Sequence, residues 1–215
     1  RREFLKSAGT ALIGSAALPF VFQVNPAFAM KNNTLKVGLI GCGGRGTGAA
    51  LQALKADTDA VLTCMGDIFS DYLDESYQAL FEANPNQVKV GKENRFVGFD
   101  AYKKVIESDV DVVILTTPPG FRPGHFKAAI EAGKHVFCEK PLAITADQAR
   151  EMVEAAKSNN RILEVAFNYR RRKDIGMVRD MVANGELGRV YHSRVSWKRR
   201  AGIPGLTSWF TSSAM

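Results

Sequence analysis

Cysteine is scarce in this chain: its 215 residues include three, at wide spacings. Cys42, Cys64 and Cys138 each lie in or beside an apolar run that resembles a strand. An odd number of widely spaced cysteines excludes a disulfide framework and lacks the paired spacing of a zinc site. We therefore predict three buried structural thiols and no metal centre.

Long apolar runs, repeats and nucleic-acid motifs are also missing. The apolar run over 7–22 is short and Pro19 interrupts it, so it does not predict a membrane span. The formal net charge is +7, but the basic residues are spread along the chain and no aromatic-studded motif accompanies them. With 46% hydrophobic and 24% charged residues, the composition is that of a globular protein. We expect no nucleic-acid partner and no membrane span in the mature protein.

Residues 1–29 have the order of an export signal. A twin-arginine block (1–6) precedes the apolar run, and Ala27-Phe28-Ala29 has the small-x-small pattern of a signal-peptidase site. The alternative is a buried helix with a basic cap, which the prolines at 19 and 26 disfavour. We predict a twin-arginine signal peptide over 1–29 and a periplasmic protein, and this export route suits a protein that binds its cofactor before export.

From residue 33 onward, apolar strand patterns alternate with helical patterns. The predicted strands are 35–40, 60–65, 95–99, 110–116, 135–138 and 162–167, and the predicted helices are 47–56, 71–83, 101–107, 124–132 and 146–158. Asp100 and Thr145 are predicted helix N-caps, and Gly133 a C-cap. The alternation indicates an α/β protein with a doubly wound parallel sheet, a Rossmann domain that we assign to 33–169.

The pattern changes after residue 169. A helix is predicted over 175–183, a turn over 184–188, and an alternating antiparallel strand over 189–197. We interpret 170–215 as the incomplete start of an α+β domain for substrate binding and oligomerisation, too short for a core of its own. The chain has no initiator methionine and its last residues end no element, so we expect a fragment.

A glycine-rich turn between the first strand and the first helix is the main candidate for cofactor binding. Its spacing, G-x-G-x-x-G, places backbone amides and a helix N-terminus where a dinucleotide pyrophosphate binds. Gly41 permits the tight turn, Gly43 lets the phosphate approach, and Gly46 lets helix and strand pack. The candidate cofactor ligands of this turn are Gly41, Cys42, Gly43, Gly44, Arg45 and Gly46.

Asp67 ends the second predicted strand, where an acidic side chain accepts hydrogen bonds from the adenosine ribose and repels a 2′-phosphate. It therefore favours NAD over NADP. The alternative is that Asp67 caps the following turn. NADP remains possible, because Arg45 offers a cation to a phosphate.

Two further strand ends carry polar side chains. Thr116, Thr117 and Pro118 lie at the carboxyl end of the fourth strand, and Glu139-Lys140 at that of the fifth, so we expect both to border one crevice and the cofactor. The alternative for the first group is a plain end of the strand before a loop. Lys140 is suited to proton exchange beside a nicotinamide, or to polarising a substrate hydroxyl or carbonyl. Its alternative is a surface lysine before a turn proline.

These motifs together resemble the Gfo/Idh/MocA family, the relatives of glucose–fructose oxidoreductase and inositol dehydrogenase. The matching segments are 41–46, Thr117-Pro118-Pro119, 132–136, Glu139-Lys140-Pro141, Asn168-Tyr169-Arg170 and 185–188. The resemblance implies NAD(P)-dependent oxidation or reduction of a small-molecule sugar or cyclitol, with Lys140 in the catalytic centre and in contact with the substrate. It also implies that Glu139 and Pro141 shape the nicotinamide pocket, with a cis bond before the proline.

The resemblance further implies that Asn168 lies near the nicotinamide, that Tyr169 and Arg170 lie near the sugar, and that the full-length protein is a homo-oligomer. Family members carry a later glycine-rich segment with an Asp and an acid/base His, and this chain stops at Met215 before one. We therefore predict that the fragment alone is inactive. Two other functions stay open: an NAD-dependent glycosidase on the same scaffold, and a non-catalytic nucleotide-binding or chaperone-like protein.

Overall fold

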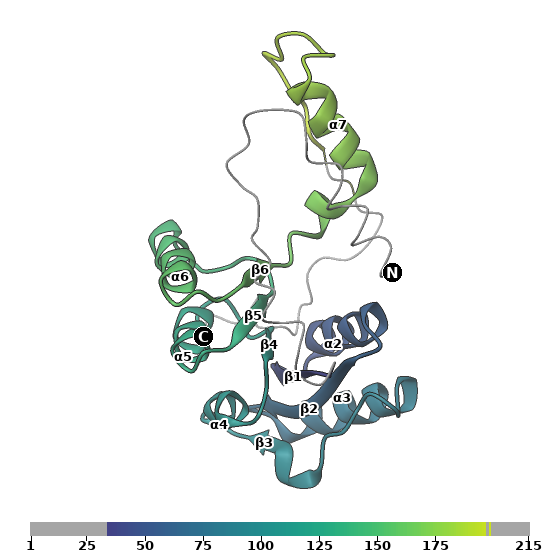
Figure 1. The fold of residues 1–215 in the computed structure, drawn as a ribbon, viewed down its shortest axis with the longest axis vertical. Coiled ribbons are helices and arrows are strands. Elements are labelled where there is room, and N and C mark those ends of the chain that lie inside the picture. Colours follow the sequence, from purple (N-terminus) through teal and green to yellow (C-terminus); the bar gives the residue numbers. More distant parts are fainter. Residues whose placement is uncertain (1–33, 197, 199–215) are drawn as a thin grey trace. The chain divides into compact units, whose positions relative to one another are not determined.

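A parallel six-stranded sheet forms the centre of the domain in a computed structural model that describes residues 34–196 and 198 (Figure 1). The expected signal peptide, Trp197 and 199–215 lie outside the described residues. The strands are β1 (Leu35–Ile40), β2 (Ala60–Asp67), β3 (Arg95–Val97), β4 (Val112–Leu115), β5 (His135–Cys138) and β6 (Leu163–Val165). Their order is β3-β2-β1-β4-β5-β6, with every pairing parallel. This is the doubly wound order, so the predicted fold class is confirmed.

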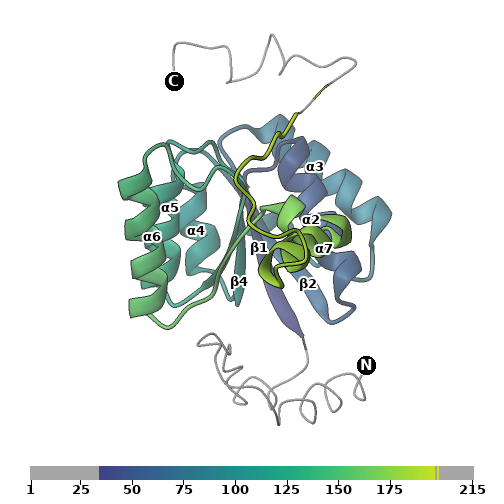
Figure 2. The same ribbon diagram turned by 90° about the horizontal axis from the view of Figure 1, so that it is seen from above.

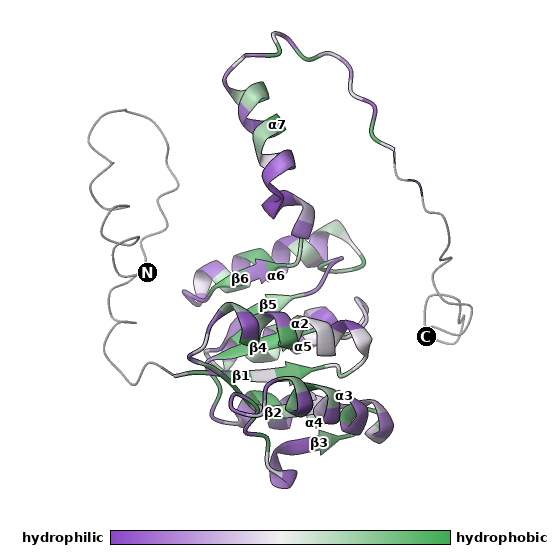
Figure 3. Ribbon diagram, turned by 90° about the vertical axis from the view of Figure 1, so that its right-hand side faces the viewer, coloured by the Kyte–Doolittle hydropathy of each residue, from purple (hydrophilic) through white to green (hydrophobic). Residues whose placement is uncertain are grey.

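Helices cover both faces of this sheet (Figure 2). The helices are α2 (Gly44–Ala56), α3 (Ser70–Ala83), α4 (Ala101–Glu107), α5 (Arg122–Glu131), α6 (Ala146–Ser158) and α7 (Lys173–Ala183), with short 3₁₀ turns η2 (Lys92–Asn94) and η3 (Asn168–Arg171). Figure 2 shows α2 and α3 on one side of the strands and α4, α5 and α6 on the other. Because helices cover both faces, the central strands β1, β2 and β4 are largely apolar, while the exposed helix surfaces carry many hydrophilic residues (Figure 3).

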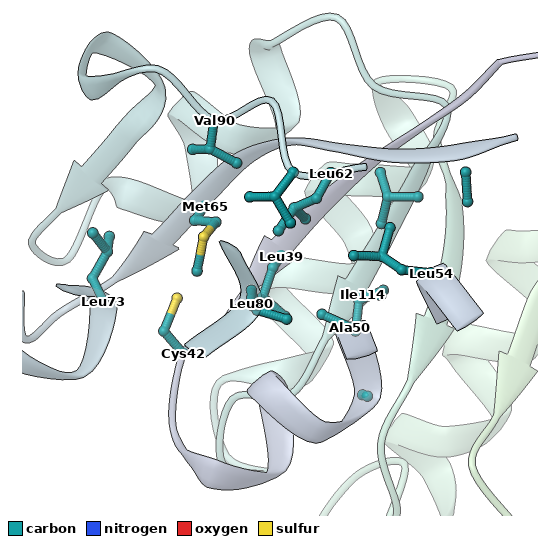
Figure 4. Packing of buried hydrophobic residues seen from close by; sticks show 14 residues of the cluster. Leu39, Cys42, Ala50, Leu54, Leu62, Met65, Leu73, Leu80, Val90 and Ile114 are labelled. Carbon is teal, nitrogen blue, oxygen red and sulfur yellow. The ribbon is translucent and has the colours of Figure 1, made fainter. Parts of the chain in front are cut away.

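One buried cluster lies between the sheet and the α2–α3 layer (Figure 4). Leu39, Leu62, Leu54 and Leu80 are at most 1% exposed, and they come from two strands and two helices. Burying a leucine side chain contributes about 1.5–3 kcal/mol relative to leaving it in water, so this cluster fixes α2 and α3 on the sheet. The helix that follows the glycine-rich turn is thereby held rigidly against β1.

A second buried cluster fills the opposite face and includes residues of β4, β5, α5 and α6. Phe126 of α5 is its largest fully buried side chain. The three cysteines are buried free thiols, as predicted. Burial raises the pKa of all three thiols, for Cys64 and Cys138 to about 11.

Helix ends account for several of the predicted boundaries. Thr145 accepts the Gln148 amide at 3.2 Å in a complete capping box, so this N-cap prediction is confirmed. Asp100 stands at the N-cap of α4, but its side chain pairs with Lys103 rather than with a backbone amide. Gly133 (φ +74°) follows α5 in the left-handed conformation that ends helices.

The antiparallel strand predicted over 189–197 is wrong for its described residues. No strand forms over 189–196, and Tyr191 and Val195 are more than nine-tenths exposed. A strand needs a hydrogen-bonded neighbour, and residues 189–196 pair with no strand of the described sheet. None of the residues of α7 is buried. Within the described part of the chain, no helix is long and apolar enough to cross a membrane.

Candidate functional site

The carboxyl ends of β1, β2, β4 and β5 meet at one edge of the sheet, which brings the predicted motifs together. The Gly41 amide donates to the carbonyl of Gly66 at 2.9 Å, joining the end of β1 to the end of β2. The amide of Thr116 donates to Ile40 at 2.9 Å, and that of Glu139 to Leu115 at 3.0 Å. In this fold, ligands bind at the point where the strand order reverses, here between β1 and β4.

The four glycines of the glycine-rich turn differ in backbone conformation and in the space around them. Gly41 has φ +93°, a conformation that side chains with a Cβ rarely adopt. A Cβ on Gly46 would lie 1.8 Å from the carbonyl oxygen of Gly41, so only glycine lets α2 start this close to β1. A Cβ on Gly43 or Gly44 would meet no atom within 4 Å. Backbone conformation therefore explains Gly41 and packing explains Gly46, while Gly43 and Gly44 leave open space.

Helix α2 begins within this turn with unpaired amides. It has no side-chain cap and no acidic residue in its first turn. The first amides of a helix have no intrahelical acceptor and carry the positive end of its dipole. Thr116 of the neighbouring strand end holds the turn in place, since its hydroxyl donates to the carbonyl of Gly41 at 2.6 Å. The arrangement fits an anionic group above Gly43.

Asp67 lies at the end of β2 and is half-buried. Its Oδ2 accepts the Cys42 amide at 2.5 Å, and its Oδ1 accepts the Phe69 amide at 3.0 Å. The second bond is the turn-capping contact that was the alternative interpretation of this residue. A carboxylate has about four acceptor positions, so capping leaves Asp67 able to accept further donors.

An ion pair connects the glycine turn with the end of β5. Arg45 Nε and Nη2 lie 2.6 and 2.5 Å from Oε1 of Glu139, although the residues are 94 positions apart. The Glu139 side chain is 3% exposed and that of Arg45 is 42% exposed. A buried carboxylate requires such a partner. Arg45 therefore supplies the cation that neutralises the buried Glu139 carboxylate.

Lys140 follows Glu139 directly and is exposed. The Lys140–Pro141 peptide bond is cis, as the family resemblance implied. Glu139 Oε2 accepts the Lys140 amide at 3.2 Å. Within residues 34–196, no ion pair involves the Lys140 ammonium. Its backbone is therefore anchored in the site while its side chain extends into solvent.

Arg122 is a residue of this site that the sequence analysis missed. It is 4% exposed and opens α5, which was predicted to start at Gly124. Pro123 was the available signal, because proline favours the first turn of a helix and places the start before itself. No local pattern predicts that the arginine is buried.

Thr117 and His125 lie beside Arg122. The Thr117 hydroxyl lies 3.3 Å from His125 Nδ1, and the imidazole stacks on Tyr102 with ring centroids 3.9 Å apart. Burial lowers the pKa of His125 to about 4, so the ring is neutral near pH 7. These contacts give His125 a structural role beside Thr117 and Tyr102.

Asn168, Tyr169 and Arg170 lie in η3, directly after the carboxyl end of β6, the neighbour of β5. All three are exposed. The Arg170 guanidinium lies over the ring of Phe167 at 4.6 Å. The described residues contain no group of three or more His, Cys, Asp and Glu side chains that could hold a metal ion.

Comparison with known proteins agrees with this geometry. The Gfo/Idh/MocA model, described as an oxidoreductase family with an NAD-binding Rossmann fold, matches residues 35–167. The chain belongs to this family. The D-glucoside 3-dehydrogenase of Escherichia coli (strain K12) is 34% identical over 179 residues, covering 82% of this chain and 47% of that protein.

Two further similarities bear on the site of this family member. A glycosyl hydrolase family 109 protein of Shewanella pealeana is 29% identical over 213 residues, covering 92% of this chain and 45% of that protein. The solved structure of a levoglucosan dehydrogenase in complex with NADH and levoglucosan superposes with a TM-score of 0.59 at 27% identity, covering 73% of this chain and 41% of that one. The chain spans about half the length of the curated relatives it matches.

Proposed function

We propose that the full-length protein is an NAD-dependent oxidoreductase that transfers hydride between a carbon of a sugar or cyclitol and the nicotinamide ring. The observation that carries this proposal is the Arg45–Glu139 ion pair. It joins the glycine turn to the residue that directly precedes the exposed Lys140. A phosphate-binding turn and a proton-exchanging side chain are thus adjacent on one sheet edge.

The glycine turn fits a dinucleotide. Gly43 and Gly44 leave space that a Cβ would fill, and the free amides at the start of α2 face an anion favourably. When bound, the nicotinamide accepts or donates a hydride. Gly41–Gly46 would hold the pyrophosphate, and Thr116, Thr117, Pro118, Glu139 and Asn168 would border the rest of the cofactor.

Asp67 supports NAD rather than NADP. Its carboxylate stands at the end of β2, where the adenosine ribose binds in this fold, and it would repel a 2′-phosphate. Arg45, the cation of the glycine turn, pairs with Glu139. The ribose hydroxyls would share Asp67 with the amides of Cys42 and Phe69.

Lys140 is proposed as the proton-exchanging group. Its ammonium Nζ would give a proton to the sugar oxygen during reduction, and its neutral amine would take one during oxidation. A nearby positive charge makes the neutral amine easier to reach. Tyr169 and Arg170 would contact the sugar from the adjacent η3.

The sequence also supports proposals about export, domain bounds and oligomeric state. We propose that residues 1–29 direct export to the periplasm by the twin-arginine route, that 33–169 form the cofactor domain, and that 170–215 begin the substrate domain of a homo-oligomer. Replacement of Arg1-Arg2 by two lysines in the full-length precursor, followed by cell fractionation, tests the export prediction. Export at the unchanged level would contradict it.

The test of the enzymatic proposal uses the full-length protein. Purified protein is examined for bound NAD(H) or NADP(H), and nicotinamide absorbance is followed across a panel of sugars and cyclitols. We expect bound or binding NAD and turnover that falls about 10²- to 10⁴-fold in Lys140→Ala. Lys127→Ala, an exposed lysine on α5, is the matched control and should retain full turnover. Absence of both dinucleotide binding and turnover would contradict the proposal.

An NAD-dependent glycosidase is the second candidate, favoured by the similarity to the Shewanella pealeana glycosyl hydrolase over 92% of this chain. Such an enzyme would cleave a glycoside with no net formation of NADH. Product analysis by mass spectrometry in the same sugar panel, extended to aryl glycosides, separates the two activities.

A further inference from the structure

The Arg122 side chain connects two loops of the site by itself. Its Nε donates to the carbonyl of Thr117 at 2.7 Å, and its Nη1 donates to the carbonyl of Glu139 at 2.7 Å and also to that of Pro141. Thr117 follows β4, while Glu139 and Pro141 belong to the turn after β5. One guanidinium therefore ties together the loops that follow two adjacent strands.

Burial of the Arg122 guanidinium costs free energy, so packing alone does not explain an arginine at this position. The guanidinium is buried and its acceptors are carbonyl groups, while the nearby carboxylate of Glu139 pairs with Arg45. Burial lowers the pKa of Arg122, and a cation at the N-terminus of α5 also faces the positive end of the helix dipole. Apolar residues of similar volume often give equal or greater stability in such positions. Arginine supplies what they lack, a planar set of donors with fixed directions.

The positions of the three carbonyl acceptors show which part of the backbone Arg122 holds in place. The carbonyls of Glu139 and Pro141 flank Lys140 on both sides, and the Glu139 carboxylate is held separately by Arg45. The backbone around Lys140 is thus fixed on each side, while its own side chain stays exposed.

We propose that Arg122 is a positioning residue: by binding the carbonyl groups on both sides of Lys140, it fixes where the lysine ammonium stands relative to the loop after β4. This inference rests on the proposed role of Lys140. It adds a residue that touches neither cofactor nor substrate, and it predicts that Arg122 acts on turnover only through Lys140.

The test is a double-mutant cycle in the full-length enzyme with Arg122→Lys, Lys140→Ala and the double variant, measured by single-turnover kinetics with NAD. Arg122→Lys keeps the charge and loses the planar set of donors. We expect it to lower the rate about 10- to 100-fold, the effect of displacing a reacting group by about 1 Å. The dissociation constant for NAD should change much less than the rate. Arg95→Lys is the matched control, because half-buried Arg95 also donates to a carbonyl, that of Val90 at 3.2 Å, and its rate should match the wild type.

The double variant gives the decisive comparison. If Arg122 works through Lys140, then Arg122→Lys slows the Lys140→Ala enzyme little or not at all. If the two losses multiply, Arg122 has a general structural role and the inference is wrong. Circular dichroism and urea denaturation monitor folding. If Arg122→Lys does not fold, Arg122→Gln enters the same cycle, and failure of both variants to fold would assign Arg122 to folding alone.

Failure of the proposed function looks different from failure of this inference. If Lys140→Ala turns over like the wild type, the proposed role of Lys140 is wrong, and the role of Arg122 is wrong with it. If Lys140→Ala is slow but the losses multiply, only the role of Arg122 is overturned.

Discussion

Substitution of Gly43 by alanine separates cofactor binding from folding at the glycine-rich turn. Gly43 has φ −66° and ψ 176°, an extended conformation open to alanine, and the added methyl group would meet no atom within 4 Å. Gly46 differs, because its Cβ would lie 1.8 Å from the Gly41 oxygen. Gly43→Ala should therefore fold and lose cofactor affinity, whereas Gly46→Ala should lose both.

The magnitudes follow from these contacts. Gly43 stands at the N-cap of α2, where alanine is less favourable, so we expect a loss of about 1 kcal/mol or less in the free energy of unfolding. The methyl group occupies the space left for the pyrophosphate. Loss of one hydrogen bond to a charged group costs about 1.5–3 kcal/mol, which raises the dissociation constant for NAD about 10- to 150-fold. Gly46→Ala adds an overpacking cost of about 1–3 kcal/mol to the unfolding free energy.

Calorimetric titration of the full-length protein with NAD and urea denaturation together give both quantities. Gly48→Ala is the matched control in α2, because its Cβ would lie 3.6 Å from Arg45 Nη1, an ordinary contact. This variant should bind NAD like the wild type. A folded Gly43→Ala protein with the wild-type dissociation constant would refute the assignment of this turn to a dinucleotide.

Three other predictions concern single side chains. Asp67→Asn should reduce the preference for NAD over NADP about tenfold or more, because it removes the charge that repels a 2′-phosphate. Titration of the variant with both nucleotides measures this preference, and an unchanged preference would contradict the role of Asp67. Burial raises the pKa of Cys64 and Cys138 to about 11, so at pH 7–8 a thiol reagent should label the cysteines in urea and not in the native protein. Burial lowers the pKa of His125 to about 4, so only the unfolded chain takes up its proton as the pH falls from about 6.5 towards 4. The free energy of unfolding should then fall by at most about 1.4 kcal/mol per pH unit, and His125→Phe should remove this part of the slope in urea titrations at pH 7 and 4.5.

Local sequence patterns predicted most of the fold. The predicted bounds of β1, β5 and α4 agree with the structure, because each is an apolar or amphipathic run with clear flanking residues. The start of α2 was placed at Thr47 instead of Gly44, since glycine has a low helix propensity and hides a helix that starts within the turn. The strand over 189–197 was predicted from alternation alone, and alternation does not supply a pairing partner.

The candidate site was predictable where it depends on strand ends. Parallel strands deliver their carboxyl ends to one edge, so the closeness of the glycine turn, Asp67 and Glu139 followed from the order of elements. The contacts that join these segments did not follow. The Arg45–Glu139 pair spans 94 positions, and the burial of Arg122 depends on three carbonyls from two loops. Such long-range pairing leaves no local pattern.

Transfer of a labelled hydrogen tests the central claim most directly. The full-length protein is incubated with NAD and a panel of sugars and cyclitols deuterated at their carbon-bound positions, and the recovered nucleotide is analysed by mass spectrometry. Our account predicts NADH that carries one deuterium from a single carbon of the substrate, with the rate reduced about 10²- to 10⁴-fold in Lys140→Ala. Nucleotide that binds but acquires no deuterium from any substrate would contradict hydride transfer at this site.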